Sequence, residues 1–251
     1  VLDAFVHLTA PPQEEEPVAE KPVEKGAEIL PEMEEVTIEV EEPKKQRVTR
    51  GAKPGTVKAD TRDGIEVFTF AEMPFVRILA GKFLMGSKED NELAYDDEYP
   101  QHTLELPEFY MARFPVTNTE YARFSAANFK IPKGKNDHPV VEISWHDAVK
   151  YIQWLNETVK DDLPEGFAYT LPTEAQWEKA ARGVDGRIYP WGNTPATCEY
   201  AVINDGTGSG FCGEGNTVWP VGSKPKGVSP YGALDMAGNA WEWVADWYAE
   251  E

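Results

Sequence analysis

The chain has 251 residues, of which 41% are hydrophobic and 12% aromatic, which is enough apolar material for one sizeable core and additional segments. Its formal net charge of −20 argues against sequence-independent binding to nucleic acid or anionic lipid, because both require a basic surface. No apolar run approaches the roughly 20 residues of a membrane span, so we expect no segment that crosses a bilayer.

Residues 1–73 are predicted to form an extended, low-complexity arm. Residues 11–42 contain twelve Glu against two Lys together with repeated Pro, so they bury too little apolar area to offset the entropy cost of ordering. Residues 44–58 reverse the charge, with six Lys or Arg and no acid. Two interpretations stay open, a tether with solvated charges and an arm that docks along the surface of a partner protein.

The folded domain is predicted to span residues 74–251. Phe75–Leu79 and Lys82–Met85 are typical of two short strands separated by a bend at Ala80–Gly81, and Thr103–Leu106 alternates like a half-buried strand. Eight Trp together with 20 Gly and 20 Pro indicate a loop-rich domain whose core is built from large rings.

Three helix starts share one capping pattern, in which a hydroxyl residue precedes an acid or amide by three positions. The pairs are Thr117 with Glu120, Ser144 with Asp147, and Thr173 with Gln176. Apolar residues at helical spacing follow the second and third pairs, so we expect short helices there. Residues 183–227 are so rich in Gly, Pro and Asn that we expect irregular loops held by Trp191 and Trp219.

Seven short blocks follow one another in a fixed order: Phe75–Ser87, Pro115–Tyr121, His138–Trp145, Leu171–Glu178, Tyr189–Asn193, Pro220–Ser223 and Asp235–Trp243. Together they resemble the formylglycine-generating enzyme family, also called the sulfatase-modifying-factor domain. The resemblance implies an α+β fold that is an elaborated relative of the C-type lectin fold, with little regular secondary structure. Well-known members oxidise a sulfatase cysteine to formylglycine with molecular oxygen and copper, others are fused to kinases, and many bacterial members have no assigned activity.

The cysteines depart from the family pattern. The family's copper-binding pair lies downstream of the Trp-Glu-Trp motif, whereas Cys198 and Cys212 lie upstream of it. We therefore assign no catalytic residue to this chain, and expect copper only if a cysteine segment follows Glu251. We also expect the domain to be completed either by such residues or by another polypeptide, since a domain ending at Glu251 would expose a large apolar surface.

Cys198 and Cys212 leave two possibilities. A two-thiolate Cu(I) site is chemically feasible. A disulfide closing a loop of about fourteen residues would restrict the unfolded chain by roughly 3 kcal/mol, and cysteine arithmetic favours it. A disulfide predicts an oxidising, extracytoplasmic compartment, which means a periplasmic, secreted or cell-surface protein.

The resemblance also implies a structural Ca²⁺ ion, with carboxylates from Asp235 and Glu242 and backbone oxygens from Gly238 and Ala240. Ca²⁺ takes about six to eight oxygen ligands, so these groups with water would suffice. The alternative is that Glu242 accepts hydrogen bonds from the turn amides without a metal.

Two further features carry weaker expectations. A second family calcium site would fall near Asn204 and Asp205, where a disulfide would replace the ion. Trp241 and Trp243 could line a cleft, as the first of them does in catalytic relatives.

Three functions compete at this point. The favoured one is a noncatalytic interaction or scaffold module, attached to a larger assembly as a complex subunit through residues 1–73. The alternatives are a copper-dependent formylglycine-generating oxidase acting on sulfatase cysteines, whose active-site segment lies outside this chain, and a lectin-like ligand-binding domain. The scaffold carries several functions, so fold alone does not choose between them.

Overall fold

The computed structural model describes residues 2–4, 7–9, 59–62, 64–159, 163–204, 206, 210–213, 215 and 217–248. The predicted acidic segment 11–42 and basic segment 44–58 lie outside the described residues. In the part of the chain that is described, no helix is long and apolar enough to cross a membrane.

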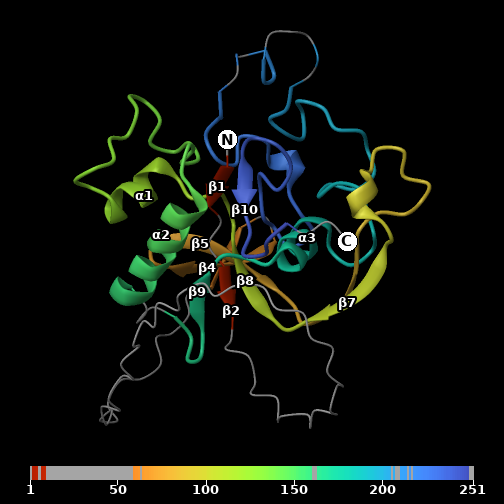
Figure 1. Cartoon of the computed structure of the whole chain (residues 1–251), viewed down its shortest axis with the longest axis horizontal. Helices are drawn as coiled ribbons and strands as arrows, with labels where there is room; N and C mark the ends of the chain where they lie inside the picture. Colours follow the sequence, from red (N-terminus) through yellow and green to blue (C-terminus); the bar gives the residue numbers. More distant parts are fainter. Residues whose placement is uncertain are drawn as a thin grey trace, which may run out of the picture. The chain divides into compact units, whose positions relative to one another are not determined.

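The centre of the fold is a six-stranded antiparallel sheet in the order β3-β4-β5-β8-β2-β9 (Figure 1). Its strands are β3 Ala59–Arg62, β4 Ile65–Phe70, β5 Met73–Ile78, β8 Phe109–Ala112, β2 His7–Thr9 and β9 Ala168–Thr170. Two smaller sheets pair β6 Gly81–Met85 with β7 His102–Leu106, and β1 Leu2–Ala4 with β10 Trp241–Trp243. The second pair is parallel.

The sheet starts earlier in the chain than the predicted boundary at residue 74. Strand β4 pairs with β5 across a two-residue turn at Ala71–Glu72, whose φ angles are 50° and 66°. Two-residue hairpins require positive φ at both positions, where Gly or Asn is usual. Neither Ala71 nor Glu72 is a residue type typical of such a turn. The hairpin, which begins within the predicted arm, could therefore not be recognised from the sequence.

Two further strands of the predicted arm also belong to the domain. β2 lies between β8 and β9, with His7 opposite Met111 on one side and Thr170 on the other. β1 runs beside β10, with Leu2 opposite Trp241. The boundary between arm and domain therefore does not fall at a single residue.

Three helices pack around the sheet: α1 Asn118–Phe124, α2 Trp145–Thr158 and α3 Glu174–Arg182, together with 3-10 turns η1 Asp96–Glu98 and η3 Pro225–Gly227. Each α-helix starts at its predicted cap, because the side chains of Thr117, Ser144 and Thr173 accept from the amide three positions later. The reciprocal bond of a capping box forms at the first and third caps. At the second, Ser144 donates its hydroxyl to Asp147 instead.

The core is built from aromatic rings, as the composition predicts. Phe70 packs edge-on against Phe75 and Tyr110, with centroids 5.4 Å apart in both pairs. Tyr151 on α2 is 1% exposed and packs against Tyr121 of α1 at 5.6 Å. These contacts attach α1 and α2 to each other and so fix the chain segments on either side of them.

Residues 183–227 form irregular structure, as expected. Among the described residues of this range, η3 is a single 3-10 turn. Trp191 stacks between Tyr189 and Tyr200, at 4.9 and 5.1 Å. Trp219 lies beneath the amine of Lys224, 4.3 Å from its ring centroid.

Candidate functional site

The end of β10 and the segment that follows it are held to the body of the domain by hydrogen bonds. The indole of Trp243 donates to the carbonyl of Ile143 at 3.2 Å, and the indole of Trp145 donates to Val244 at 2.9 Å. The amide of Ala245 donates to Pro172 at 2.8 Å. Residues 243–245 are therefore positioned by the start of α2 and by the loop before α3.

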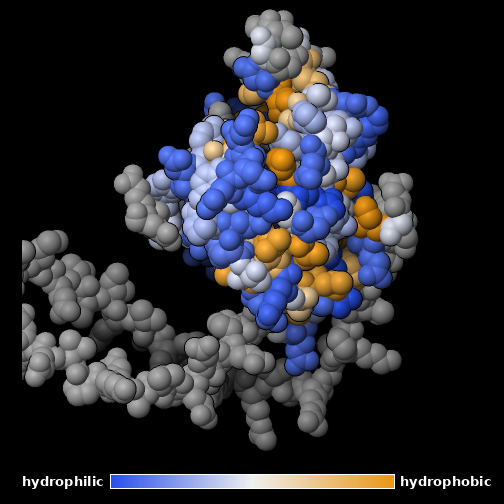
Figure 2. Space-filling view, turned by 90° about the vertical axis from the view of Figure 1, so that its right-hand side faces the viewer, coloured by the Kyte–Doolittle hydropathy of each residue, from blue (hydrophilic) through white to orange (hydrophobic). Residues whose placement is uncertain are grey.

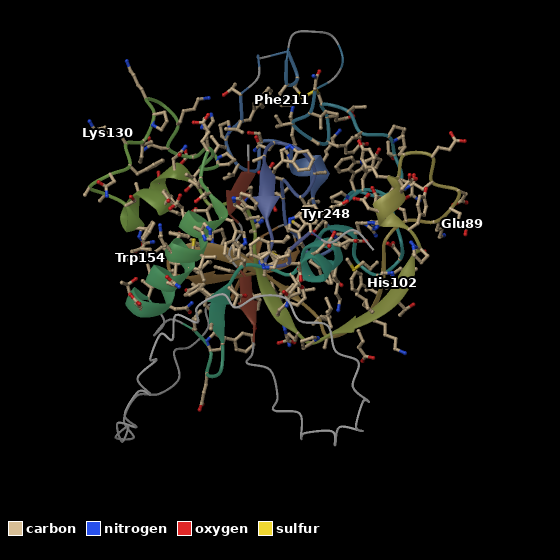
Figure 3. The ribbon with its side chains drawn as sticks, viewed as in Figure 1. Glu89, His102, Lys130, Trp154, Phe211 and Tyr248 are labelled. Atoms are coloured by element: carbon tan, nitrogen blue, oxygen red, sulfur yellow. A yellow bond between two sulfur atoms is a disulfide. The ribbon has the colours of Figure 1, made fainter. Side chains whose placement is uncertain are left out.

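This anchored segment presents two large aromatic side chains to solvent. Trp247 is 83% exposed and Tyr248 is 76% exposed. Trp247 is placed by the ring of Trp145, 5.8 Å away. In Figure 3, Tyr248 lies toward α3, near the end of the described chain. Two large aromatic rings are therefore exposed at neighbouring positions among the described residues.

Two carboxylates lie near each other where this segment meets the start of α3. Asp246 accepts a hydrogen bond of 2.6 Å from the amide of Glu174, which places it at the start of α3. Burial, and then the negative charge of Asp246, raise the pKa of Glu174. Among the described residues, neither acid forms an ion pair with a cation. We call Trp247, Tyr248, Asp246 and Glu174 the aromatic–acidic surface.

The sequence pattern did not single out this surface. Its members come from two segments that are far apart in the chain, and an exposed Trp cannot be distinguished from a core Trp by residue type. Figure 2 looks onto the side of the domain that carries β7 and η1, where apolar residues form separate groups between hydrophilic ones.

Trp241 and Trp243, the predicted cleft residues, differ in their environments. Trp241 is 75% exposed, whereas Trp243 packs against the core and its indole donates to Ile143. The side chain of Trp243 is therefore held by the core and by a hydrogen bond, whereas that of Trp241 is mostly exposed.

Asp235 is engaged by protein donors. Its Oδ2 accepts from the amide of Gly222 at 2.6 Å, and the side chain of Asn239 also hydrogen-bonds to it. Burial raises the pKa of Asp235 to about 6 in spite of these bonds. Asn239 in turn accepts from the amide of Trp219 at 2.9 Å, so the two side chains together hold the loop at residues 219–222.

Two of the other predicted calcium ligands make hydrogen bonds within the protein. The Oε2 atom of Glu242 accepts from the indole of Trp177, and the carbonyl of Gly238 accepts from the amide of Ala240 at 2.9 Å. In the described part of the chain, no group of three or more His, Cys, Asp or Glu side chains could hold a metal. Asp235 in turn accepts from Gly222 and Asn239, and a calcium ion held by these four residues stays a prediction.

The Cys198–Cys212 disulfide is present, with Cα atoms 5.5 Å apart. Neither cysteine of the sequence is a free thiol. The amide of Cys212 donates to Ile203 at 3.0 Å, which closes the loop beneath the bond. Of the weaker calcium candidates, Asn204 accepts from the amide of Gly206 at 3.0 Å and Asp205 lies outside the described residues.

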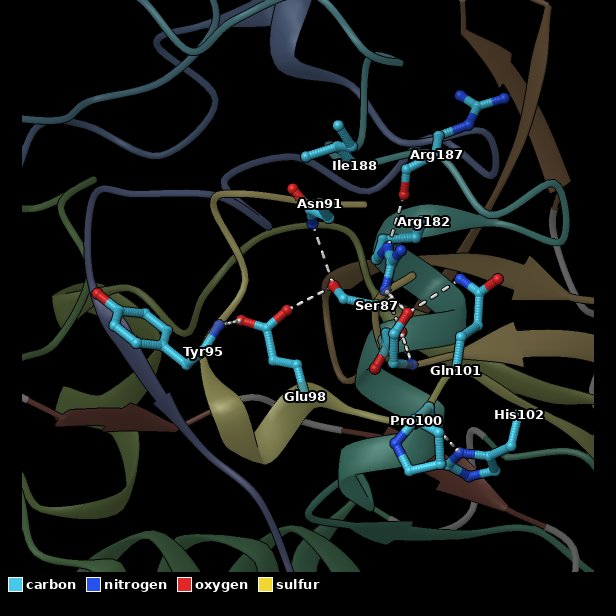
Figure 4. Close-up of polar contacts among 12 residues, drawn as sticks. Ser87, Asn91, Tyr95, Glu98, Pro100, Gln101, His102, Arg182, Arg187 and Ile188 are labelled. Carbon is cyan, nitrogen blue, oxygen red and sulfur yellow. Dashed lines mark hydrogen bonds and ion pairs between the residues drawn. The ribbon is translucent and has the colours of Figure 1, made fainter. Parts of the chain in front are cut away.

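A polar network joins the loop after β6 to α3 (Figure 4). The amide of Gly86 donates to Glu178 at 2.8 Å, and its carbonyl accepts from Arg182 at 3.0 Å. The hydroxyl of Ser87 donates to Glu98 at 2.6 Å. A Cβ atom at residue 86 would lie 2.6 Å from the carbonyl of Glu98, so only glycine fits there. Because each carboxylate already accepts from a protein donor, the network is structural.

Comparison with known proteins places these features in a family. Residues 66–251 match the family model of the sulfatase-modifying factor enzyme 1-like domain. Formylglycine-generating enzyme from Bos taurus is 30% identical over 231 residues, which cover 69% of this chain and 58% of that protein. The chain thus spans little more than half the length of this relative.

Two other relatives show how widely the domain is used. The serine/threonine-protein kinase pkn1 of Chlamydia caviae is 32% identical over 205 residues, which cover 71% of this chain and 28% of the kinase. The solved structure of PvdO from Pseudomonas aeruginosa superposes with a TM-score of 0.56 and 26% identity, covering 79% of this chain and 77% of that one. The chain therefore belongs to the sulfatase-modifying factor family, as its seven sequence blocks indicated.

Proposed function

We propose that this chain is a noncatalytic binding module of its family, and that its aromatic–acidic surface takes a basic, extended segment of a partner protein. The observation that carries the proposal is the pairing of two exposed rings, Trp247 and Tyr248, with two carboxylates that have no ion-pair partner among the described residues. Arg and Lys side chains match both halves of such a surface, through cation–π contacts with the rings and charge-assisted bonds to the acids.

The disulfide supports a structural role for Cys198 and Cys212. Copper chemistry in the family requires thiolates, and these two cysteines are joined to each other. The bond also supports an extracytoplasmic location, since disulfides persist in oxidising compartments.

The relatives support the modular part. In the chlamydial kinase the matching region is 28% of the protein, so the domain occurs there as one component of a larger chain. We infer in the same way that the charged segments 11–42 and 44–58, within the predicted arm of residues 1–73, attach this domain to a larger assembly.

A peptide-binding experiment tests the surface. A fluorescein-labelled peptide of alternating Arg and Ala is titrated with the full chain, and a matched Glu–Ala peptide serves as the control for charge. We expect the basic peptide to bind with micromolar affinity and the acidic peptide not to bind. Trp247→Ala should bind the basic peptide about tenfold more weakly, because the cation–π and packing contacts are lost. Leu79→Ala, which removes an exposed apolar side chain elsewhere, should bind as the wild type does. Equal binding of both peptides would refute the proposal.

The oxidase is the second candidate, favoured by the 30% identity to a named formylglycine-generating enzyme. It is tested by incubating the purified chain with copper, oxygen, a reductant and a sulfatase-derived cysteine peptide, and measuring aldehyde formation by mass spectrometry. We expect no aldehyde. Product formation that tracks the concentration of this chain would replace the binding module with the enzyme.

A further inference from the structure

A cavity of about 550 Å³ opens at the start of α1, away from the residues that form the aromatic–acidic surface. Its walls come from the β4–β5 turn, the segment before α1 and the loop at residues 220–221. The lining groups that matter for its chemistry are Glu72, Phe114, Glu120, Arg123, Asp137 and Pro220. The volume lies within the range of small-molecule sites, which is about 300–1,000 Å³.

Backbone hydrogen bonds hold the walls together. The amide of Asn118 donates to the carbonyl of His138 at 2.9 Å, and the amide of Thr119 donates to Asn136 at 3.2 Å. The amide of Val221 donates to the carbonyl of Asp137 at 2.8 Å. The three chain segments around the cavity are thus tied to one another, so the cavity is formed in advance of any ligand.

The one basic side chain that lines the cavity is already engaged. A guanidinium nitrogen of Arg123 donates to the carbonyl of Ala71 at 2.8 Å and forms an ion pair of 3.3 Å with Glu72. Arg123 therefore pairs with the turn that it supports, and its charge also acts on Glu120. It is not available as the main anchor for an anionic ligand.

The other two carboxylates of the lining belong to Glu120 and Asp137. Glu120 uses its Oε2 atom as an acceptor for the amide and hydroxyl of Thr117, at 2.7 and 2.9 Å. No ion pair joins Glu120 or Asp137 to a cation within the described ranges. Burial raises the pKa of Glu120, the bonds to Thr117 and the charge of Arg123 lower it, and the charge of Asp137 raises it, so Asp137 and Arg123 both lie within electrostatic reach of Glu120.

The remaining wall is apolar. The ring of Phe114 is covered on one side by the guanidinium of Arg113, 5.4 Å from its centroid, and a Cβ atom on Gly222 would lie 2.7 Å from its edge. Phe114 and Pro220 can therefore pack against a short apolar body. A ligand that satisfies the whole cavity has a cationic head and an apolar chain or ring.

We propose that this cavity binds a primary ammonium group carried on a short apolar body, with the ammonium beside Glu120 and Asp137 and the body against Phe114 and Pro220. An ammonium supplies three hydrogen-bond donors and a compact positive charge, which two carboxylates on one side of a cavity can share. The group could belong to a free amine or to a lysine side chain of a peptide.

Calorimetric titration of the full chain at pH 8 tests the proposal with named probes. Phenethylamine is the free amine, Nα-acetyl-lysine amide represents a peptide lysine, and phenylacetate matches the first probe in shape but carries the opposite charge. We expect at least one amine to bind and phenylacetate to give no heat at about 10 mM. The tighter of the two amines identifies the source. Absence of binding by both amines, or equal binding of phenylacetate, would overturn the proposal.

Isosteric variants locate the site. Asp137→Asn should weaken the amine about tenfold, because it removes one charge-assisted bond. Glu120→Gln keeps an acceptor for Thr117 and should weaken amine binding by a similar factor. Glu89→Gln changes an acid outside the cavity lining and should leave amine binding unchanged. Unchanged affinity in Asp137→Asn and Glu120→Gln would overturn the assignment. Trp247→Ala must leave amine binding intact, which separates this site from the proposed binding surface.

Discussion

The indole nitrogen of Trp145 donates a hydrogen bond of 2.9 Å to the carbonyl of Val244, and so joins the first residue of α2 to the segment that follows β10. The same indole ring lies 5.8 Å from that of Trp247. One side chain therefore both anchors this segment and places the exposed ring that the proposed function uses.

Replacing Trp145 with Phe keeps an aromatic ring but removes the donor. The carbonyl of Val244 loses its partner, so the free energy of unfolding should fall by about 1 kcal/mol and binding of the basic peptide should weaken. Urea denaturation and peptide titration measure the two effects. Trp154→Phe is the matched control on the same helix, since the indole of Trp154 has no hydrogen bond among the described contacts, and it should leave peptide binding unchanged. Equal effects of the two substitutions would contradict the anchoring role.

Removing the disulfide should destabilise the domain. Cys198 and Cys212 are separated by 14 positions, and a loop of this length corresponds to roughly 3 kcal/mol in the unfolded-chain model. The Cys198→Ser, Cys212→Ser double variant should therefore unfold at lower urea than the oxidised wild type. Reductant should bring the wild type to the same midpoint and leave the double variant where it is. If reductant left the urea midpoint of the wild type unchanged, the disulfide would contribute no stability.

Asp235 should make stability depend on pH in a defined direction. Its pKa is raised from 3.8 to about 6, so between these values the folded state binds a proton that the unfolded state has released. The resulting contribution is fully present below the lower value and is lost as pH rises through 6, with a magnitude of up to about 3 kcal/mol. Asp235→Asn should remove this part of the pH profile.

The comparison of wild type and Asp235→Asn is best made from pH 4 to pH 7 by chemical denaturation. Glu120 and Glu174, whose pKa values are also raised, are common to both proteins and cancel in the difference. Because Gly222 and Asn239 hold the Asp235 carboxylate, the difference should be the same in EDTA and in Ca²⁺. A difference that appears only in Ca²⁺ would restore Asp235 as a metal ligand.

Lys179 should be essential to the attachment of α3. Its side chain is 1% exposed, and its amine donates to the carbonyls of Leu79 and Gly81 at 2.8 Å each. Lys179→Met has a similar volume but leaves both buried carbonyls without this donor, which should cost about 3 kcal/mol in thermal or urea unfolding. Lys82→Met, at an exposed position, should change stability by less than about 0.5 kcal/mol. Comparable losses in the two variants would contradict the role.

Features that depend on neighbouring residues could be predicted from the sequence. The caps at Thr117, Ser144 and Thr173 are local, since donor and acceptor lie three positions apart, and all three helices begin there. The strands expected at 75–79, 82–85 and 103–106 appear as β5, β6 and β7 with slightly shifted ends. Cysteine arithmetic favoured the Cys198–Cys212 bond correctly.

Features that depend on residues far apart in the chain could not be predicted from the sequence. The amide that donates to Asp235 belongs to Gly222, in a loop whose path is not encoded by any local pattern, so this hydrogen bond could not be predicted. The cavity beside Glu120 likewise needs Asp137 and Pro220 to be brought to α1 by backbone pairing. Tertiary proximity decides both sites, and periodicity contains no information about it.

The interior position of β2 gives the domain an unusual order of assembly. Residues 7–9 are synthesised before β8 and β9, yet they fill the space between them, so the main sheet cannot close until Thr170 has been made. Pairing over such sequence distances favours slow folding. It also means that in a chain cut between β2 and β3, strand β2 would still be held by main-chain hydrogen bonds on both of its edges.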